Sequence, residues 1–366
     1  MKLRDLIYSM LAKPAARRTA EASQQAKRLL VLTNGHNPTF TYYLEERLSR
    51  SPLASDIRGL TDRLDDLDPD GLFVIVCRYI RPRQLLWLYR NRRKLAGACL
   101  FIDDDVAATV TAKGGSLPYK AYLLAIGIAP LPVLNRLLTA VWASTPALAA
   151  ALKAGGRSRS VTTLAPFPPQ ATITPAVSDG NKNPLIIAFH ATGSHDAEHA
   201  FLVPVIREAL ARCQDIHFEV IAEGGPARLW SKARLPPERF ALHPKRDWTG
   251  YLRETARRRT DIMLVPLLQS RMNDVRSGTK RFDAVRMGAA VIFSRCSVYE
   301  RFADAEEILV GNDVSSWVEA ICRLARDSET RQRTRQATLR AVSAILADTP
   351  TSFPIYPGNH SEKMPT

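Results

Sequence analysis

Short apolar runs alternate along most of the chain with longer stretches in which apolar residues recur every three to four positions. The short runs predict buried strands, and their ranges are 29–33, 72–77, 98–102, 141–144, 185–190, 217–222, 261–265 and 290–294. The longer stretches predict helices, and their ranges are 41–48, 83–95, 146–153, 198–212, 279–287, 315–326 and 329–346. Because strands and helices alternate, the pattern predicts an α/β fold with parallel sheets.

The stretch before residue 185 interrupts this alternation, since it is rich in Pro, Thr, Ser and Asn and the pattern restarts after it. We therefore predict two Rossmann-like domains, over residues 28–170 and 185–347, joined by a linker over 171–184. Residues 1–27 are predicted to form a basic amphipathic segment, and residues 348–366 are predicted to form a flexible tail. Two such domains predict a cleft with a ligand at the carboxyl ends of the strands.

Composition narrows the class of protein. With 46% hydrophobic and 24% charged residues, the chain of 366 residues is globular rather than disordered or fibrous. Its 51 Lys and Arg residues exceed its 36 Asp and Glu residues, which indicates an anionic partner. The basic residues are spread out and no aromatic RNA-binding signature occurs, so nucleic acid is not a predicted partner. The five cysteines are widely spaced without a CxxC pair, which favours free thiols in a reducing, cytoplasmic compartment.

Membrane contact is a second prediction. The N-terminal segment carries an apolar helical stripe surrounded by basic residues, formed by Leu3, Leu6, Ile7, Met10 and Leu11 with Lys2, Arg4, Lys13, Arg17 and Arg18. Such a segment lies on an anionic membrane, here the inner face of the plasma membrane, or docks on the protein body. Arg90, Arg92, Arg93 and Lys94 form a further basic helix face that suits phospholipid or a glycan phosphate. No transmembrane helix is predicted, and 121–134 is expected to be a buried or interfacial hairpin.

The stretch from Asn273 to Gly288 is the most informative part of the sequence. It follows one predicted strand and precedes another, with Ser277 or Thr279 as a helix cap and Gly288 as the helix end. A helix N-terminus attracts phosphate, and the flanking Arg276 and Lys280 add cationic donors. Asp283 follows Lys280 on the same helix face, where it can accept hydrogen bonds from ribose. The alternative is an ordinary capped helix with a surface charge network.

Two other groups of residues invite a chemical interpretation. His195 and His199 have helical spacing, but no Glu follows as in HExxH, so no metal site is predicted. Asp103, Asp104 and Asp105 follow a predicted strand, and three interpretations stay open: an acceptor-side group that orients a hydroxyl, a D-x-D metal motif, or acids that cap a helix. His36, after the first strand, is a weaker acceptor-side candidate.

Taken in order, several motifs resemble the donor-binding half of GT-B glycosyltransferases of the family 4 type, the glycosyl transferases group 1. The resemblance rests on the stretch FHATGSHDAE over 189–198, on a W-x-x-Y element, on a V-S-T-x-x-L-like segment within 140–152, and on the residues Asp261, Pro266, Leu267, Asn273, Arg276, Ser277, Lys280, Asp283, Gly288 and Val291. The W-x-x-Y element is formed by Trp248 and Tyr251.

The resemblance implies a GT-B fold, in which two Rossmann-like domains with parallel sheets face each other across a cleft. Residues 28–170 would be the acceptor-side domain and 185–347 the nucleotide-sugar-binding domain. Arg276 and Lys280 would be catalytic and hold the leaving diphosphate. The implied donor-binding residues are Gly193, Ser194, His195, Asn273, Ser277 and Asp283, and the acceptor-side candidates are His36, Asp103, Asp104 and Asp105.

The implied activity is transfer of a sugar, of the hexosyltransferase type, from a nucleotide-diphosphate donor to a hydroxyl of a surface glycan or lipid-linked acceptor, as in capsule, lipopolysaccharide or exopolysaccharide biosynthesis. Transfer would be retaining and metal-independent, with the nucleotide sugar as donor substrate and no cofactor. The sequence departs from the family pattern, because Asp283 replaces the usual Glu and Val275 stands where a paired Glu is expected. A non-catalytic interaction protein on the same fold and a sugar-nucleotide epimerase therefore stay open as alternatives.

Overall fold

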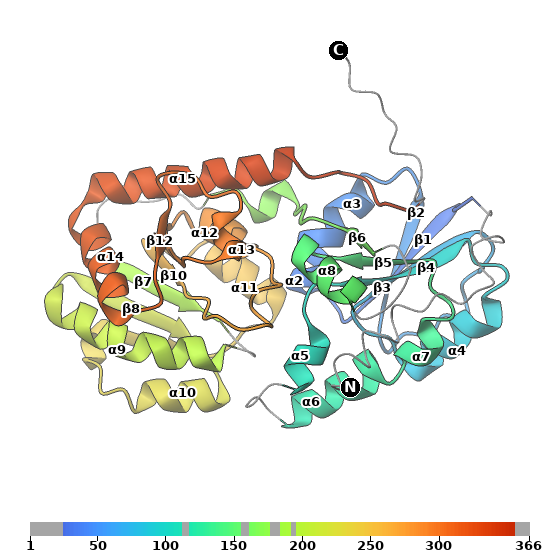
Figure 1. The fold of residues 1–366 in the computed structure, drawn as a ribbon, viewed down its shortest axis with the longest axis horizontal. Coiled ribbons are helices and arrows are strands. Elements are labelled where there is room, and N and C mark those ends of the chain that lie inside the picture. Colours follow the sequence, from blue (N-terminus) through green and yellow to red (C-terminus); the bar gives the residue numbers. More distant parts are fainter. Residues whose placement is uncertain (1–24, 112–116, 155–160, 176–183, 192–194, 356–366) are drawn as a thin grey trace, which may run out of the picture. The chain divides into compact units, whose positions relative to one another are not determined.

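The computed structural model describes residues 25–111, 117–154, 161–175, 184–191 and 195–355. The N-terminal amphipathic segment up to residue 24 lies outside these ranges. The chain divides into two compact units, of which the first comprises Met1–Phe167 with Thr349–Thr366 and the second comprises Pro168–Asp348. Each unit is built on one sheet with helices on both sides, as the alternation of apolar patterns predicts (Figure 1).

The first unit contains a six-stranded parallel sheet in the order β2-β1-β3-β4-β5-β6. Its strands are β1 (Arg28–Thr33), β2 (Ala54–Gly59), β3 (Leu72–Cys77), β4 (Gly97–Ile102), β5 (Ala140–Ala143) and β6 (Val161–Thr163). Every residue of β3 and β4 is buried, which agrees with the apolar runs that predicted them. The edge strand β2 was not predicted, because its polar and half-exposed sequence has no apolar run.

The helices of the first unit are short, and two of them contain π-helical turns. They are α2 (Pro38–Phe40), η1 (Thr41–Glu45), α3 (Glu46–Ser49), α4 (Pro82–Asn91), α5 (Val106–Thr111), α6 (Leu117–Leu123), η2 (Leu124–Ile128), α7 (Leu131–Leu134) and α8 (Pro146–Ala154). The Asn37 side chain caps the first of these helices by accepting from the Phe40 N–H, and Pro38 occupies its first position.

The second unit contains a six-stranded parallel sheet in the order β12-β11-β10-β7-β8-β9. Its strands are β7 (Leu185–His190), β8 (Ile216–Ile221), β9 (Phe240–His243), β10 (Ile262–Val265), β11 (Ala290–Ser294) and β12 (Ile308–Val310). The central strands match the predicted apolar runs. The outermost strands β9 and β12 are short and half-buried, and the apolar pattern did not identify them.

The helices of the second unit form a layer on each side of its sheet. They are η3 (Gln170–Thr172), α9 (Asp196–Arg212), α10 (Gly224–Ser231), η4 (Pro237–Arg239), α11 (Trp248–Thr255), α12 (Lys280–Met287), α13 (Ser297–Glu300), α14 (Val314–Arg326) and α15 (Ser328–Ala347). Ile262 and Leu264 of β10 pack with α9 and α14, whereas Met263 and Val265 pack with α12. Alternate side chains of one strand thus enter two separate cores.

The ends of the second unit differ from the predicted linker and tail. Within the predicted linker, Thr172 belongs to η3, and its carbonyl accepts from the Arg286 guanidinium at 3.3 Å. Beyond Asp348 the chain returns to the first unit, where the Phe353 ring stacks on Trp142 with centroids 5.7 Å apart. Thr349 is buried and Phe353 is packed, so this part of the predicted tail is anchored to the first unit.

Candidate functional site

The second unit gathers its predicted site residues at the carboxyl ends of β7 and β10. These strands are neighbours, and chain order reverses between them, so they flank the topological switch point at which α/β sheets bind ligands. The Lys280 ammonium, at the first residue of α12, donates to the His190 carbonyl at the end of β7 at 3.0 Å. This bond connects the helix that follows β10 to the neighbouring strand.

His195 and Arg276 are in contact near the carboxyl ends of these two strands, although 81 positions separate them in sequence. The Arg276 guanidinium lies 2.6 Å from His195 Nε2. Burial lowers the pKa of His195, and the cationic Arg276 and Lys280 lower it further, so the imidazole is neutral at pH 7. Since arginine only donates, Nε2 is the acceptor and the ring proton is placed on Nδ1. That nitrogen faces the Glu198 carboxylate at 3.5 Å.

Glu198 is a site residue that the sequence interpretation missed. Its buried Oε1 accepts from the Asn273 side-chain amide at 2.8 Å and from the Leu268 N–H at 3.1 Å. Burial alone would raise the pKa of Glu198, but the nearby His195 ring and the hydrogen bond from the Leu268 N–H outweigh burial and lower it. The Glu198 carboxylate therefore holds the loop after β10, through Leu268 and Asn273, next to His195. The available signal was an acid three residues after His195, in the first turn of α9.

Asp283 lies within α12 rather than on an open surface. Its side chain is almost fully buried and accepts from Lys280 at 3.0 Å and from Arg286 at 2.6 Å. Arg286 also donates to the Thr255 hydroxyl at 3.0 Å. The carboxylate thus positions the ammonium of Lys280, and its bond to a ribose stays a prediction.

The remaining donor-side predictions have mixed outcomes. Gly288 has φ 63°, in the left-handed region, and ends α12 as predicted. Thr279 precedes the helix, but its side chain makes no capping hydrogen bond. Ser277 is half-buried in the loop before α12. Gly193 and Ser194 lie outside the described residues.

The first unit gathers a second polar cluster at the carboxyl ends of β1, β3 and β4. Arg78 forms ion pairs with Asp103 at 3.1 Å and Asp104 at 3.3 Å, and it donates to the Thr39 hydroxyl at 3.1 Å. Thr39 in turn donates to Asp103 at 2.5 Å. Burial raises the pKa of Asp103, although the Arg78 guanidinium opposes this shift. Arg78 has φ 68°, a strained conformation for a residue with a side chain.

The three aspartates have different roles in the structure. Asp105 caps α5, because its Oδ1 accepts from the Ala108 N–H at 2.7 Å. The capping interpretation is therefore confirmed for Asp105, whereas Asp103 and Asp104 pair with Arg78. His36 lies elsewhere in the loop after β1, where its ring is 2.9 Å from the Thr41 hydroxyl and 3.2 Å from Glu45.

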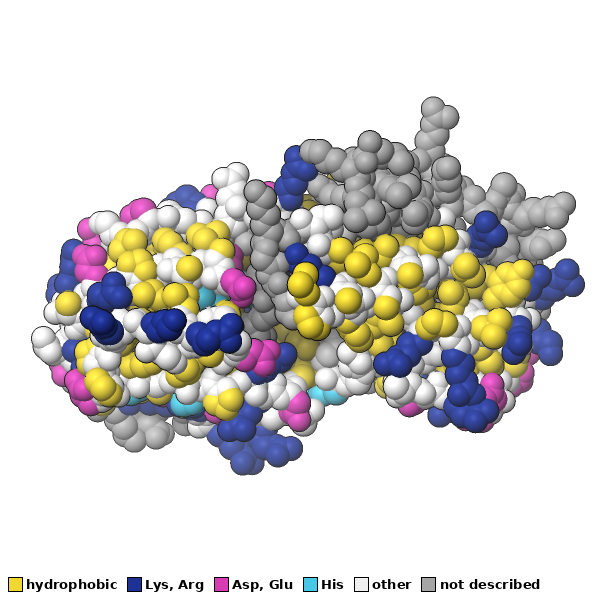
Figure 2. All heavy atoms as spheres, turned by 90° about the horizontal axis from the view of Figure 1, so that it is seen from below, with side chains coloured by type: hydrophobic (Ala, Val, Ile, Leu, Met, Phe, Trp, Pro, Cys, Tyr) yellow, Lys and Arg dark blue, Asp and Glu magenta, His cyan; other side chains and the backbone are white. Residues whose placement is uncertain are grey.

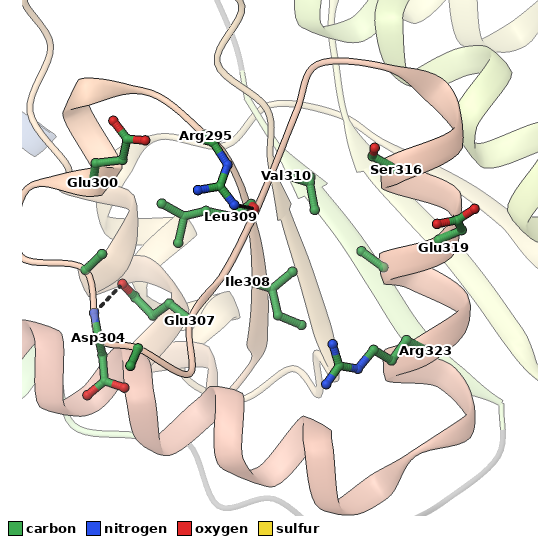
Figure 3. Close-up of a pocket in the computed structure, with 13 residues that line it drawn as sticks. Arg295, Glu300, Asp304, Glu307, Ile308, Leu309, Val310, Ser316, Glu319 and Arg323 are labelled. Atoms are coloured by element: carbon green, nitrogen blue, oxygen red, sulfur yellow. Dashed lines mark hydrogen bonds between the residues drawn. The ribbon is translucent and has the colours of Figure 1, made fainter.

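Among the described residues, no group of three or more His, Cys, Asp and Glu side chains is arranged to hold a metal ion. A pocket of about 610 Å³ lies in the second unit beside β12 and α14. Figure 3 shows Arg295, Asp304 and Arg323 among its lining side chains. None of the predicted site residues lines it, so this pocket is separate from the cluster around Arg276 and Lys280.

Two α/β units, each with a six-stranded parallel sheet, are the components of the GT-B fold, and comparison with solved structures assigns this fold to the chain. The chain superposes on sucrose-phosphate synthase from Thermosynechococcus elongatus with a TM-score of 0.58 and 12% identity, over 87% of this chain and 95% of that one. The chain also superposes on Anabaena HepE in complex with UDP and glucose. The TM-score is 0.56 and the identity is 11%, over 88% of this chain and 97% of that one.

TarM of S. aureus is also similar, with a TM-score of 0.55, 12% identity and coverage of 79% of this chain. The chain covers 54% of TarM, about half its length. No protein-family model and no curated protein sequence matches the chain. The superpositions on these solved structures show that the chain has the GT-B fold. Identities this low establish the fold alone.

Proposed function

We propose that the protein is a glycosyltransferase that moves a sugar from a nucleotide-diphosphate donor to a hydroxyl of a surface glycan or lipid-linked acceptor. The observation that carries this proposal is the meeting of Arg276, Lys280 and neutral His195 at the switch point of the second unit. Two fixed cations at the N-terminus of a helix suit a diphosphate. The structure of HepE, which has the same fold, holds UDP and glucose.

In this proposal Arg276 and Lys280 bind the diphosphate oxygens. Negative charge grows on this leaving group as the bond to the sugar breaks, so fixed cations stabilise the transition state more than the bound donor. Their positions are set in advance, because His195 contacts Arg276 while Asp283 and the His190 carbonyl hold Lys280. Less reorganisation is then required as the charge develops.

The Asp103 cluster of the first unit is the acceptor side of the proposed reaction. A carboxylate whose pKa burial raises is a better proton acceptor than an exposed one, so Asp103 is suited to orient a hydroxyl and accept its hydrogen bond. We also propose that transfer is metal-independent, with Arg276 and Lys280 in place of a divalent ion, and that it retains the anomeric configuration. Unchanged turnover in a chelator and the configuration of the first-formed product test these two points.

A thermal-shift screen against a panel of nucleotide sugars tests the proposed function. A true donor binds the folded state and stabilises it by about 2.7 kcal/mol at a hundredfold excess over its Kd. The stabilising donor is then incubated with glycan and lipid-linked acceptors, and products are analysed by mass spectrometry. Transfer or donor hydrolysis supports the proposal, binding without turnover supports a non-catalytic protein, and an epimerised donor supports an epimerase. Absence of stabilisation by every donor would contradict the proposal.

A further inference from the structure

Exposed apolar side chains concentrate on one face of the first unit. Eight large hydrophobic side chains are exposed among the described residues, and six of them belong to α4 or to the helical stretch Leu117–Leu134. These six are termed the apolar face, and they are Leu86, Tyr89, Leu117, Tyr119, Leu124 and Val133. Figure 2 shows a broad field of hydrophobic side chains on this side of the unit, with Lys and Arg side chains around it. A field of this kind marks an interaction surface.

The two parts of the apolar face belong to one surface. The Ile80 N–H, just before α4, donates to the Ile126 carbonyl at 3.2 Å, and the Tyr79 and Tyr122 rings meet edge to face. The stretch Leu117–Leu134 is long and apolar enough to cross a membrane, with a mean hydropathy of 1.4. One side of it is nevertheless packed on the unit, where Leu123 and Ile126 are buried with Tyr79. It therefore lies along the protein surface, with its other side exposed.

Basic residues predominate around the apolar face, although one of them, Arg83, pairs with Asp65 at 3.0 Å. The exposed basic residues there are Arg81, Arg83, Arg90, Arg93, Lys94 and Arg136. Between positions 71 and 170 the sequence contains no Asp or Glu except Asp103, Asp104 and Asp105. Arg90, Arg93 and Arg136 form no ion pair with a carboxylate in the part of the chain that the structure describes. The surroundings of the apolar face thus carry an excess of positive charge.

We propose that the apolar face binds an anionic phospholipid bilayer. Its aliphatic and tyrosine side chains enter the boundary between headgroups and acyl chains, while the surrounding arginines contact lipid phosphates. Tyrosine suits this depth because its ring is apolar and its hydroxyl is polar. A second copy of the chain is a poorer occupant, since symmetric pairing would bring two arginine-rich rims together. This proposal does not depend on the proposed reaction, because binding is measured without donor or acceptor.

Vesicle co-sedimentation of the full chain tests the proposal. We expect binding to phosphatidylcholine vesicles that contain about 30% phosphatidylglycerol, little binding to phosphatidylcholine alone, and weaker binding as salt rises. Leu117→Ser with Leu124→Ser is expected to weaken binding to the anionic vesicles about tenfold, and Arg90→Gln with Arg93→Gln by about as much. Two double variants at exposed positions elsewhere are the matched controls and should bind normally. The apolar control is Ile57→Ser with Leu339→Ser, and the basic control is Arg228→Gln with Lys232→Gln.

Unaltered melting temperatures show that the exposed substitutions leave the variants folded. Equal binding of the face variants and their controls would overturn the proposal, as would equal binding to neutral and anionic vesicles. Loss of binding in Lys2→Gln with Arg4→Gln, without loss in the face variants, would assign the membrane contact to the N-terminal segment instead. A dimer in light scattering that the Leu117 and Leu124 substitutions dissociate would identify a second copy as the occupant.

Discussion

The two units place polar clusters at equivalent points of similar sheets but give them opposite charge. In the second unit, Arg276, Lys280 and Arg286 outnumber the carboxylates of Asp283 and Glu198 around a neutral His195. In the first unit, the carboxylates of Asp103 and Asp104 outnumber the single Arg78. The cluster of the second unit therefore favours an anionic ligand, and the cluster of the first unit favours a group that donates hydrogen bonds. The scaffold supplies the location, whereas the loop residues supply the chemistry.

The units also differ in how they hold these charges. The first relies on one arginine in a strained backbone conformation, whereas the second distributes its contacts over two loops and a helix. A single substitution at the first cluster thus removes all of its positive charge. At the second cluster the same kind of change leaves other cations in place.

The largest effect is expected for Lys280→Ala. Sugar transfer should fall about a thousandfold in kcat, because a cation that faces the developing charge is removed. The fold should persist, since Arg286 still neutralises Asp283 at 2.6 Å. Steady-state kinetics with a donor from the thermal-shift screen measure the change. Arg271→Ala, an exposed arginine in the same loop, is the control, and full activity of Lys280→Ala would contradict the assigned role.

Asp103→Asn tests the other side of the comparison. We expect kcat to fall about a hundredfold, because an amide does not accept a proton from the acceptor hydroxyl. Stabilisation by the donor should be unchanged, since Asp103 belongs to the first unit and the donor residues belong to the second. Thermal shift and kinetics together measure this separation. Equal loss of donor binding and of turnover would show that the two clusters are not divided by substrate.

The second unit should lose stability in acid. Burial lowers the pKa of His190 to about 3, so below pH 6.5 the unfolded chain binds protons that the folded chain does not. This contribution is complete above pH 6.5 and is lost as the pH falls toward 3. Between pH 6.5 and 5 the loss amounts to about 1.6 kcal/mol, which urea unfolding measures. His190→Gln should reduce this loss of stability in acid, and His36→Gln, in the first unit, serves as the control. An unchanged loss in His190→Gln would show that His190 is not its cause.

The smallest effect is expected for Glu198→Gln. Glutamine keeps an acceptor for Asn273 and Leu268 but removes the charge beside His195. The imidazole is then held less firmly, so we expect the donor Kd to rise about tenfold, with a smaller change in melting temperature. Titration calorimetry measures the Kd. Glu208→Gln, at a half-exposed position on the same helix, is the control. An unchanged Kd in Glu198→Gln would show that Glu198 has no part in donor binding.

The central strands and the main helices could be predicted from the sequence because their burial leaves a clear apolar period. β10 and α12 are examples, since a buried run precedes the helix and Gly288 ends it. β2, β9 and β12 could not be predicted in this way. They form sheet edges, where side chains are half-exposed and no continuous apolar run is required.

The chemistry of the sites was predictable only in part, for a related reason. A loop and helix with Arg276, Lys280 and Asp283 can be found from local spacing, because these residues are close in sequence. Glu198 meets Asn273 from 75 positions away, and Arg78 meets Thr39 from 39 positions away. Such pairs form only once neighbouring strands are aligned, so a local motif does not reveal which carboxylate is buried and which arginine neutralises it.

The packing of Phe353 on Trp142 has a consequence for biosynthesis. The first unit is not contiguous, since its last packed residues are made after the whole of the second unit. Arg47 illustrates the delay, because its buried guanidinium donates to the Pro350 carbonyl at 2.8 Å and lacks that acceptor until then. At ribosomal rates of about 5–20 residues per second, roughly 10–40 s pass between synthesis of residue 167 and residue 355. A nascent chain therefore completes the later unit before the earlier one.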